Sequence, residues 1–192
     1  MVAELQAAIE MRGLLLVHDR ELPSATKLLA GEPVSGSWWS HPQANAIYNA
    51  LQALDEDVRS LKLVRGKVTL IHRRLWPSVL GIALGGESWQ TAKLRSDARF
   101  LLDQVRVQGE LRSDGIDLPD GSRKLGTVVT DLEKRLLVRS VQIHTDTGKH
   151  VRVLHSWEVA WPDVEPISAV DGRFKLEALT AGWRPGKLFP WE

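Results

Sequence analysis

The sequence follows the same plan twice, with an offset of about 80 residues. Residues 31–76 and 109–157 each open with a Gly-Glu pair and pass through a loop containing Pro into a helical stretch. Each copy then continues through an apolar strand, a Gly-Lys turn, a second strand, a His and a Trp. Repeats of about 20–50 residues indicate solenoids. The longer period here predicts two copies of a small domain.

Within each copy the predicted order is helix, loop, helix, two-stranded ribbon. This order is typical of a winged helix, a helix-turn-helix variant that binds nucleic acid or another protein. We therefore predict an α+β fold of two tandem winged-helix modules, each with three helices and a β-hairpin, followed by a C-terminal arm. The expected domains are residues 1–86, residues 87–160 and an arm over residues 161–192 that packs on the body, with Gly85-Gly86 marking the first boundary.

Glycine, proline and the spacing of apolar residues set the expected elements. Helices are expected at 3–12, 22–30, 40–54, 77–84, 97–108, 125–137 and 171–179, and strands at 14–17, 61–63, 68–71, 138–143 and 151–154, with a turn at 145–148. Ser40 with Gln43 predicts a capping box, and residues 112–115 predict the start of a short helix. Phe100 is expected to face inward, and Trp76 and Trp157 are expected to close the two cores.

Composition limits the functional classes. The chain has 192 residues, no cysteine and a net charge of +1. The absence of cysteine excludes disulfides and thiolate metal sites and fits a cytoplasmic location. No stretch approaches the roughly 20 apolar residues that span a bilayer, so no membrane association is expected. A dedicated nucleic-acid coat protein would be much more basic, so any such binding must use local patches.

Two sets of basic residues are candidates for phosphate contact, because neutralising the backbone needs only positive charge within reach. The candidate nucleic-acid-binding residues are Arg65, Lys67, Arg73, Arg74, Arg123, Lys124, Lys134 and Arg135. The first four lie on or beside the first predicted ribbon, which can equally be a solvated hairpin face. Residues 55–57 are three carboxylates at the end of the preceding helix and would repel phosphate. The second set lies on a more basic helix and is the better candidate for groove entry.

The string from Trp38 to Pro42 is the most unusual local sequence. Trp38, Trp39, Ser40 and His41 are a candidate pocket, with Ser40 and His41 offering a nucleophile and a base. Capping of a helix by Ser40 explains the same residues without catalysis. Six histidines are present, but none has His-x₃-His or His-Glu-x-x-His spacing, so neither a metal site nor a cofactor is predicted.

Residues 96–157 resemble the winged helices of transcription regulators in the order and length of their elements. The tandem arrangement is similar to that of bacterial DNA glycosylases built from several winged helices. This second resemblance implies DNA binding and base excision. The Gln-x-Gln or Gln-x-Asp triplet that serves catalysis in that family is absent from this sequence, so no catalytic residue is carried over.

Three functions are consistent with the sequence. The leading interpretation is a nucleic-acid-binding protein, with DNA as the ligand and without catalysis. The second is an interaction scaffold whose winged helices bind a protein partner or each other, which the near-neutral charge favours. The third is a hydrolase acting on DNA, with the Trp38–His41 segment as its pocket. A fold alone does not choose between them.

Overall fold

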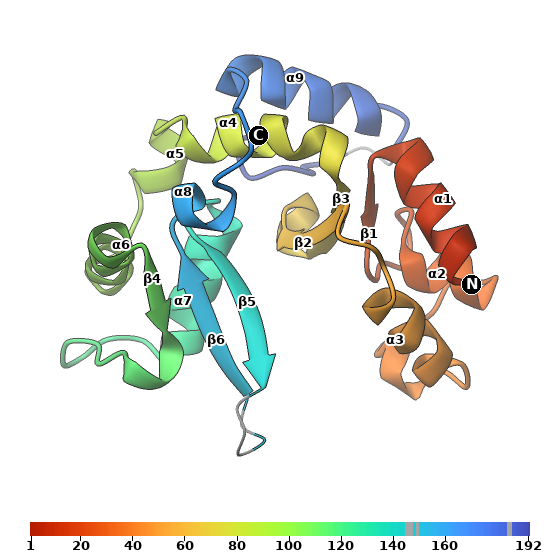
Figure 1. The fold of residues 1–192 in the computed structure, drawn as a ribbon, viewed down its shortest axis with the longest axis horizontal. Coiled ribbons are helices and arrows are strands. Elements are labelled where there is room, and N and C mark those ends of the chain that lie inside the picture. The colour runs from red at the N-terminus through yellow and green to blue at the C-terminus, as the bar shows by residue number, and fades with distance from the viewer. Residues whose placement is uncertain (145–147, 149, 184–185) are drawn as a thin grey trace. The chain divides into compact units, whose positions relative to one another are not determined.

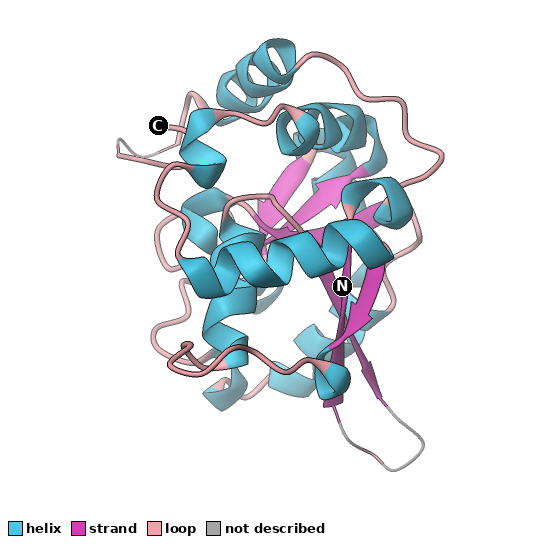
Figure 2. Cartoon of the chain, turned by 90° about the vertical axis from the view of Figure 1, so that its left-hand side faces the viewer, coloured by secondary structure: helices cyan, strands magenta, loops and turns pink. Residues whose placement is uncertain are grey.

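The computed structural model describes residues 1–144, 148, 150–183 and 186–192, which form two compact units. Unit 1 comprises residues 1–76, 173–190 and 192, and Unit 2 comprises residues 77–172 and 191. The described residues form a mixed α+β fold in which each unit has a three-stranded antiparallel sheet (Figure 1). Helices predominate over strands (Figure 2). No helix within the described ranges is long and apolar enough to cross a bilayer.

Unit 1 begins with a helix, a strand and two further helices, and a two-stranded ribbon then completes its sheet. Its elements are α1 (Val2–Arg12), β1 (Leu14–Leu16), α2 (Ala25–Ala30), α3 (Ala44–Gln52), β2 (Val58–Lys62) and β3 (Val68–His72). The strand order is β1-β3-β2, and Leu70 of β3 lies opposite both Leu15 and Ser60. Three helices and the sheet enclose one apolar core, whose buried members are Leu5, Ile9, Leu15, Ala25, Leu29, Ile47, Ala50 and Leu70.

The end of α1 is fixed by Gly13. Its φ of 82° lies in the left-handed region that favours glycine, and its N–H bonds the carbonyl of Ile9 at 2.7 Å. A Cβ at this position would lie 2.8 Å from Cδ1 of Leu75, so a larger residue would also clash. The chain can therefore turn directly from the helix into the buried strand β1, as the sequence predicted.

The capping box predicted at Ser40 is wrong. Residues Trp38–Ser40 form a short 3₁₀ turn, and α3 starts only at Ala44 with Gln43 in the N-cap position and no side-chain cap. The reason is Pro42, which disfavours the helical conformation for the residue before it. His41 accordingly has extended backbone angles, with φ −76° and ψ 140°.

Unit 2 repeats the order of helix, strand, helix and ribbon. Its elements are α4 (Trp76–Leu84, without its first residue), α5 (Ser88–Thr91), α6 (Ser96–Gln108), β4 (Glu110–Arg112), α7 (Leu125–Lys134), β5 (Arg139–His144), β6 (His150–His155) and α8 (Trp157–Ala160). The helix α9 (Ala169–Thr180) begins in Unit 2, and its residues from Arg173 onward belong to Unit 1. The strand order is β4-β6-β5, with β6 in the centre. The core between α6, α7 and the sheet is built mainly from Ala98, Leu101, Leu102, Val105, Val128, Val129, Leu132, Leu137, Val138 and Leu154.

The second helix predicted in Unit 2 does not form. Residues 110–112 pair with β6 as a strand, and residues 113–115 make only a 3₁₀ turn. Ser, Asp and Gly are weak helix formers. The guanidinium of Arg112 also donates to both carboxylate oxygens of Asp114, at 3.1 and 2.9 Å, which favours the tight turn.

Two further details of Unit 2 differ from the sequence prediction. The α7 helix ends at Lys134 rather than residue 137, because Leu136 adopts a φ of +52° while its side chain is buried. Phe100 is 38% exposed, so it does not face the core. The predicted turn at 145–148 falls mostly on residues 145–147, outside the described ranges.

Backbone segments approach closely where α4 meets the chain leading into α9. A Cβ on Gly81 would lie 1.9 Å from the carbonyl oxygen of Ile167, and one on Gly172 would lie 2.6 Å from that of Ser78. Only glycine permits contacts of this kind. Both positions are therefore expected to be intolerant of any side chain.

The two closing tryptophans differ in burial. Trp157 is 3% exposed and donates its indole N–H to the carbonyl of Leu136 at 2.7 Å, which confirms its predicted core position. Trp76 is only half-buried and lies under the guanidinium of Arg59, whose Cζ is 4.0 Å from the ring centroid. Near the C-terminus Leu188 and Phe189 are buried.

Candidate interaction surfaces

Lys67 of the first ribbon is bound to a buried carboxylate. Its Nζ lies 2.7 Å from Oδ2 of Asp19, which is 3% exposed, and the other carboxylate oxygen accepts the N–H groups of Glu21 and Leu22. Burial raises the pKa of Asp19, but the hydrogen bonds from the Leu22 N–H and the Lys67 ammonium outweigh it, and the pKa is lowered to about 2. Lys67 is thus the counter-ion of a structural carboxylate.

Arg65 lies at the tip of the same ribbon and is also engaged. Its Nη1 lies 3.7 Å from Oε2 of Glu21, and its backbone N–H donates to the carbonyl of Leu188 at 2.6 Å. Its φ of +52° is unusual for a residue with a Cβ. The ribbon tip of Unit 1 is therefore held against the C-terminal segment instead of projecting freely.

Arg73 and Arg74 follow the ribbon and differ in how firmly they are held. Arg73 Nη1 contacts Oδ1 of Asp57 at 3.2 Å, in a pair whose two side chains are both exposed. Such pairs contribute at most about 1 kcal/mol, so Arg73 can exchange this partner for another anion. Arg74 Nη2 donates to the carbonyl of Met11 at 2.9 Å. This carbonyl lies in the last turn of α1, where carbonyl groups have no hydrogen-bond partner within the helix.

Arg123 of Unit 2 belongs to a second buried ion pair. Its guanidinium donates to both carboxylate oxygens of Asp97, at 2.8 and 2.9 Å, and its backbone N–H donates to the same carboxylate at 3.1 Å. These hydrogen bonds from Arg123 hold the pKa of Asp97 well below its ordinary value, although burial opposes them. The pair joins the start of α6 to the loop before α7, across 26 residues of sequence.

Asp131 extends this pair to Arg135. One oxygen of Asp131 accepts from Arg123 at 3.2 Å, and the other accepts from Arg135 Nε at 2.9 Å. Arg135 Nη1 also donates to the carbonyls of Trp89 and Gln90, at 3.1 and 3.2 Å. Arg123 and Arg135 therefore stabilise Unit 2 internally, so neither presents a free charge to a ligand.

Lys124 and Lys134 are the two remaining candidates. Lys124 is the N-cap residue of α7 and Lys134 is its last residue, and both are exposed. Across the described ranges neither ammonium makes an ion pair or a hydrogen bond. Their separation of ten positions in the sequence corresponds to about 15 Å along the helix axis, and Thr127 and Thr130 lie in the intervening turns. The exposed side of α7 thus has a cation at each end.

In Unit 1 the segment before α3 builds an exposed aromatic surface. The rings of Trp38 and Trp39 stack at 4.2 Å between centroids, and Trp39 lies 5.4 Å from the ring of Tyr48 on α3. Trp39 is 56% exposed and Tyr48 is 39% exposed. We call these three residues the aromatic face. The exposed amides of α3, which lie on the same helix as Tyr48, are Asn45, Asn49 and Gln52.

Ser40 and His41 do not form a nucleophile and base. Within the described ranges no hydrogen bond joins the two side chains. Nδ1 of His41 instead accepts the backbone N–H of Gln43 at 3.2 Å, and its Nε2 lies 3.9 Å from Oε1 of Glu32. The candidate pocket at Trp38–His41 therefore supplies aromatic area without an activated hydroxyl.

Three of the remaining histidines have local structural contacts. His72 Nδ1 accepts the N–H of Arg74, His155 Nε2 lies 3.0 Å from Oε2 of Glu110, and His150 Nδ1 bonds the amide of Gln142. In the part of the chain that the structure describes, no group of three or more His, Cys, Asp or Glu side chains could hold a metal ion. These three histidines thus contribute to the local structure of the turns and strands.

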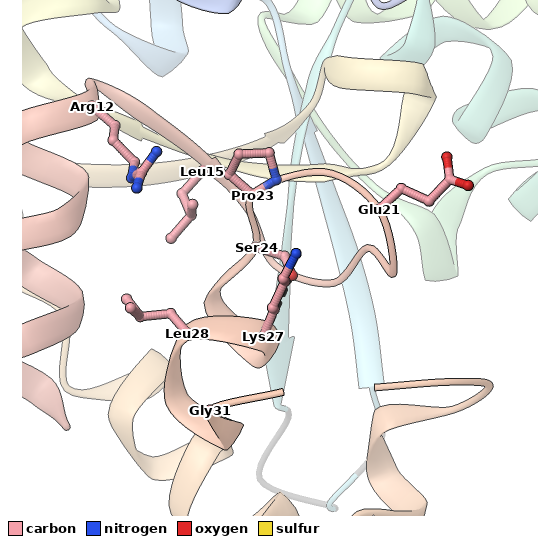
Figure 3. Close-up of a pocket in the computed structure, with 8 residues that line it drawn as sticks. All are labelled: Arg12, Leu15, Glu21, Pro23, Ser24, Lys27, Leu28 and Gly31. Carbon is pink, nitrogen blue, oxygen red and sulfur yellow. Dashed lines mark hydrogen bonds between the residues drawn. The ribbon is translucent and has the colours of Figure 1, made fainter. Parts of the chain in front are cut away.

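Sequence reasoning missed one cavity in Unit 1. It has a volume of about 410 Å³ and lies between the end of α1, strand β1 and helix α2 (Figure 3). Its lining residues are Arg12, Leu15, Glu21, Pro23, Ser24, Lys27, Leu28 and Gly31. They come from three elements and are irregularly spaced in the sequence, so no sequence motif predicts the site. The tertiary packing alone brings Arg12 and Lys27 to its walls.

No family model, curated protein or solved structure matches this chain. The residues and contacts described above are consequently the basis for inferring its function.

Proposed function

We propose that the chain is a non-catalytic binding protein made of two winged-helix units, and that Unit 1 binds a protein partner through the aromatic face. The winged-helix assignment is supported by the sheet orders β1-β3-β2 and β4-β6-β5, in which the first strand pairs with the third. It is also supported by a helix placed directly before each ribbon. In helix-turn-helix proteins a late helix of this kind meets the ligand, so α3 and α7 are the surfaces to compare.

The observation that carries the proposal is the exposure of Trp39 and Tyr48 on or beside α3. Leaving large aromatic rings in water forfeits the apolar burial that normally places them in a core. Trp and Tyr are also the residues most enriched among those that dominate protein–protein binding energy. The neighbouring amides Asn45 and Asn49 can donate and accept hydrogen bonds at the rim of such a contact.

The local charge favours a protein over a nucleic acid at this face. The helix α3 contains no Lys or Arg, whereas Asp55 and Glu56 follow it and are exposed. Phosphate binding requires neutralisation by cations. Unit 1 as a whole has thirteen basic and ten acidic residues, and most of the basic ribbon residues are already engaged. The surface is therefore suited to an uncharged or basic partner segment.

The test compares three forms of the full chain in affinity capture followed by quantitative mass spectrometry. The test variant is Trp39→Ala with Tyr48→Ala, and the matched control is Phe174→Ala, which removes a ring that is 74% exposed elsewhere in Unit 1. We expect proteins that the wild type and the control retain and the double variant loses. With a purified partner, loss of two dominant contacts should weaken binding by about thirtyfold or more. Capture that is equal for all three forms would refute the proposal.

A second candidate function, nucleic-acid binding, is favoured by the exposed lysines at both ends of α7. A separation of about 15 Å is comparable to the roughly 12 Å width of the DNA major groove, so the two ammonium groups could contact phosphates on opposite strands. Unit 2 has twelve basic and fourteen acidic residues, so any such binding is expected to be weak.

Titration of generic duplex DNA at low salt tests this second candidate. Lys124→Gln with Lys134→Gln should reduce the slope of log affinity against log salt by about 1.8, because each phosphate contact contributes about 0.9. Lys93→Gln is the control, since Lys93 is exposed in Unit 2 outside α7. Undetectable binding, or a slope that the double variant leaves unchanged, would exclude α7 as a DNA-binding surface.

A further inference from the structure

The cavity in Unit 1 combines an apolar floor with polar walls. Leu15 and Leu28 lie along one side, and Pro23 closes another (Figure 3). Leu15 is 2% exposed, so the floor is continuous with the core. Ligand pockets usually have volumes of about 300–1,000 Å³ and an apolar lining with a few polar groups. A volume of about 410 Å³ is sufficient for a small organic molecule.

The polar residues of the cavity divide into engaged and unengaged groups. The hydroxyl of Ser24 donates to the carbonyl of Asp19 at 3.0 Å and also accepts the N–H of Lys27, at 3.4 Å. Glu21 is turned away from the other lining residues (Figure 3) and faces Arg65. The acidic side chain of the rim is therefore directed out of the cavity.

Two cations remain. Arg12 is the last residue of α1, and Lys27 lies on α2. Within residues 1–144, 148, 150–183 and 186–192, neither the guanidinium of Arg12 nor the ammonium of Lys27 makes an ion pair or a hydrogen bond. Elsewhere in Unit 1 the cations Arg65, Lys67 and Arg73 each face a carboxylate. The cavity thus concentrates positive charge that the fold itself leaves uncompensated.

We propose that this cavity binds a small amphiphilic anion, a carboxylate or phosphate attached to an aliphatic body. The body packs on Leu15, Pro23 and Leu28, where it loses contact with water. The anionic group accepts hydrogen bonds from Arg12 and Lys27, and charge-assisted hydrogen bonds of this kind are stronger than neutral ones. This site is separate from the aromatic face, so its occupancy does not depend on the function proposed above.

The test uses defined probes with the full chain and measures binding by calorimetry, with ¹H–¹⁵N NMR to locate the site. Octanoate and octyl phosphate supply the two anionic groups on the same body, 1-octanol supplies the body without charge, and acetate supplies the charge without the body. We expect both long-chain anions to bind and to shift the amide signals of Leu15 and Leu28. The tighter of the two identifies the preferred anionic group. Octanol and acetate should each bind at least tenfold more weakly.

Substitutions then assign the charge recognition. Arg12→Gln and Lys27→Gln should each weaken octanoate binding by about fivefold, whereas Arg20→Gln should leave it unchanged, because Arg20 is exposed and outside the cavity lining. Octanol binding as tightly as octanoate would overturn the proposal, and this comparison needs no variant to fold. Absence of binding by both long-chain anions, or unchanged affinity in Arg12→Gln with Lys27→Gln, would also overturn it.

Discussion

Replacement of Asp19 by Asn tests whether Lys67 is a structural counter-ion. Asn keeps an oxygen that can accept the N–H groups of Glu21 and Leu22, which the wild-type carboxylate accepts at 2.8 and 2.9 Å. It removes the negative charge and turns an amide NH₂ group toward the Lys67 ammonium. Both groups are hydrogen-bond donors, so they cannot hydrogen-bond each other. The substitution therefore isolates the contact at 2.7 Å between Asp19 and Lys67 from the turn that precedes α2.

The expected loss in the free energy of unfolding follows from the pKa of Asp19, which falls from 3.8 to about 2 in the folded protein. A shift of this size corresponds to about 2 kcal/mol of stability that depends on the ionised form. The backbone N–H groups provide part of it and remain available to Asn, and Lys67 is half-exposed to screening solvent. We therefore expect Asp19→Asn to reduce the free energy of unfolding by about 1–2 kcal/mol at pH 7.

The lowered pKa of Asp19 also predicts how the stability difference between wild type and Asp19→Asn changes with pH. The folded pKa of Asp19 is lowered, so its contribution is fully present above the unfolded pKa of about 4 and is lost as the pH falls through the folded value of about 2. Urea unfolding between pH 7 and pH 2 should show the difference between wild type and Asp19→Asn shrinking toward zero over that window. Asp103→Asn, which removes an exposed carboxylate of α6, is the control and should track the wild type.

Two results would refute this reasoning. One is a wild-type free energy of unfolding in Asp19→Asn at pH 7, which would mean that the pair contributes nothing. The other is a difference that stays constant down to pH 2, which would mean that the loss arises from altered packing. In a double-mutant cycle with Lys67→Met, a coupling energy near zero would likewise show that Lys67 is available for other anions.

Further predictions concern packing and the second ion pair, and all are checked by urea or thermal unfolding. Trp157→Ala should cost about 3–5 kcal/mol because the ring is buried, whereas Trp39→Ala should stay within about 0.5 kcal/mol; equal losses would contradict the burial difference. Gly81→Ala should cost about 3 kcal/mol or more, because its Cβ would meet a backbone carbonyl at 1.9 Å; a wild-type melt would mean that the two segments can separate freely. Arg123→Met should cost about 3–5 kcal/mol by leaving Asp97 buried without its partner, and a loss below about 1 kcal/mol would show that the pair is dispensable.

The repeat in the sequence predicted much of the local architecture. The ribbons predicted at residues 61–71 and 138–154 form at residues 58–72 and 139–155, and the helix ends predicted at Gly13 and Gly109 are confirmed. These features depend on neighbours in the chain, namely apolar spacing and the left-handed conformation that glycine tolerates. The predictions that are wrong arise where local rules competed. The helix cap expected at Ser40 does not form because of Pro42, and the helix expected from Arg112 does not form because residues 110–112 pair with β6.

The sequence alone determined which residues could be charged or aromatic, and the tertiary structure decided which of them are available to a ligand. Asp19 and Lys67 are 48 residues apart, and Asp97 and Arg123 are 26 apart, so no local pattern reveals that they pair. The same holds for Arg12 and Lys27, which line one cavity because α1 and α2 pack against each other. Ion pairing and burial depend on distances in the folded structure and not on spacing in the sequence. A net charge near zero does not show whether the unpaired charges lie on a helix or in a pocket. That distribution exists only once the chain has folded.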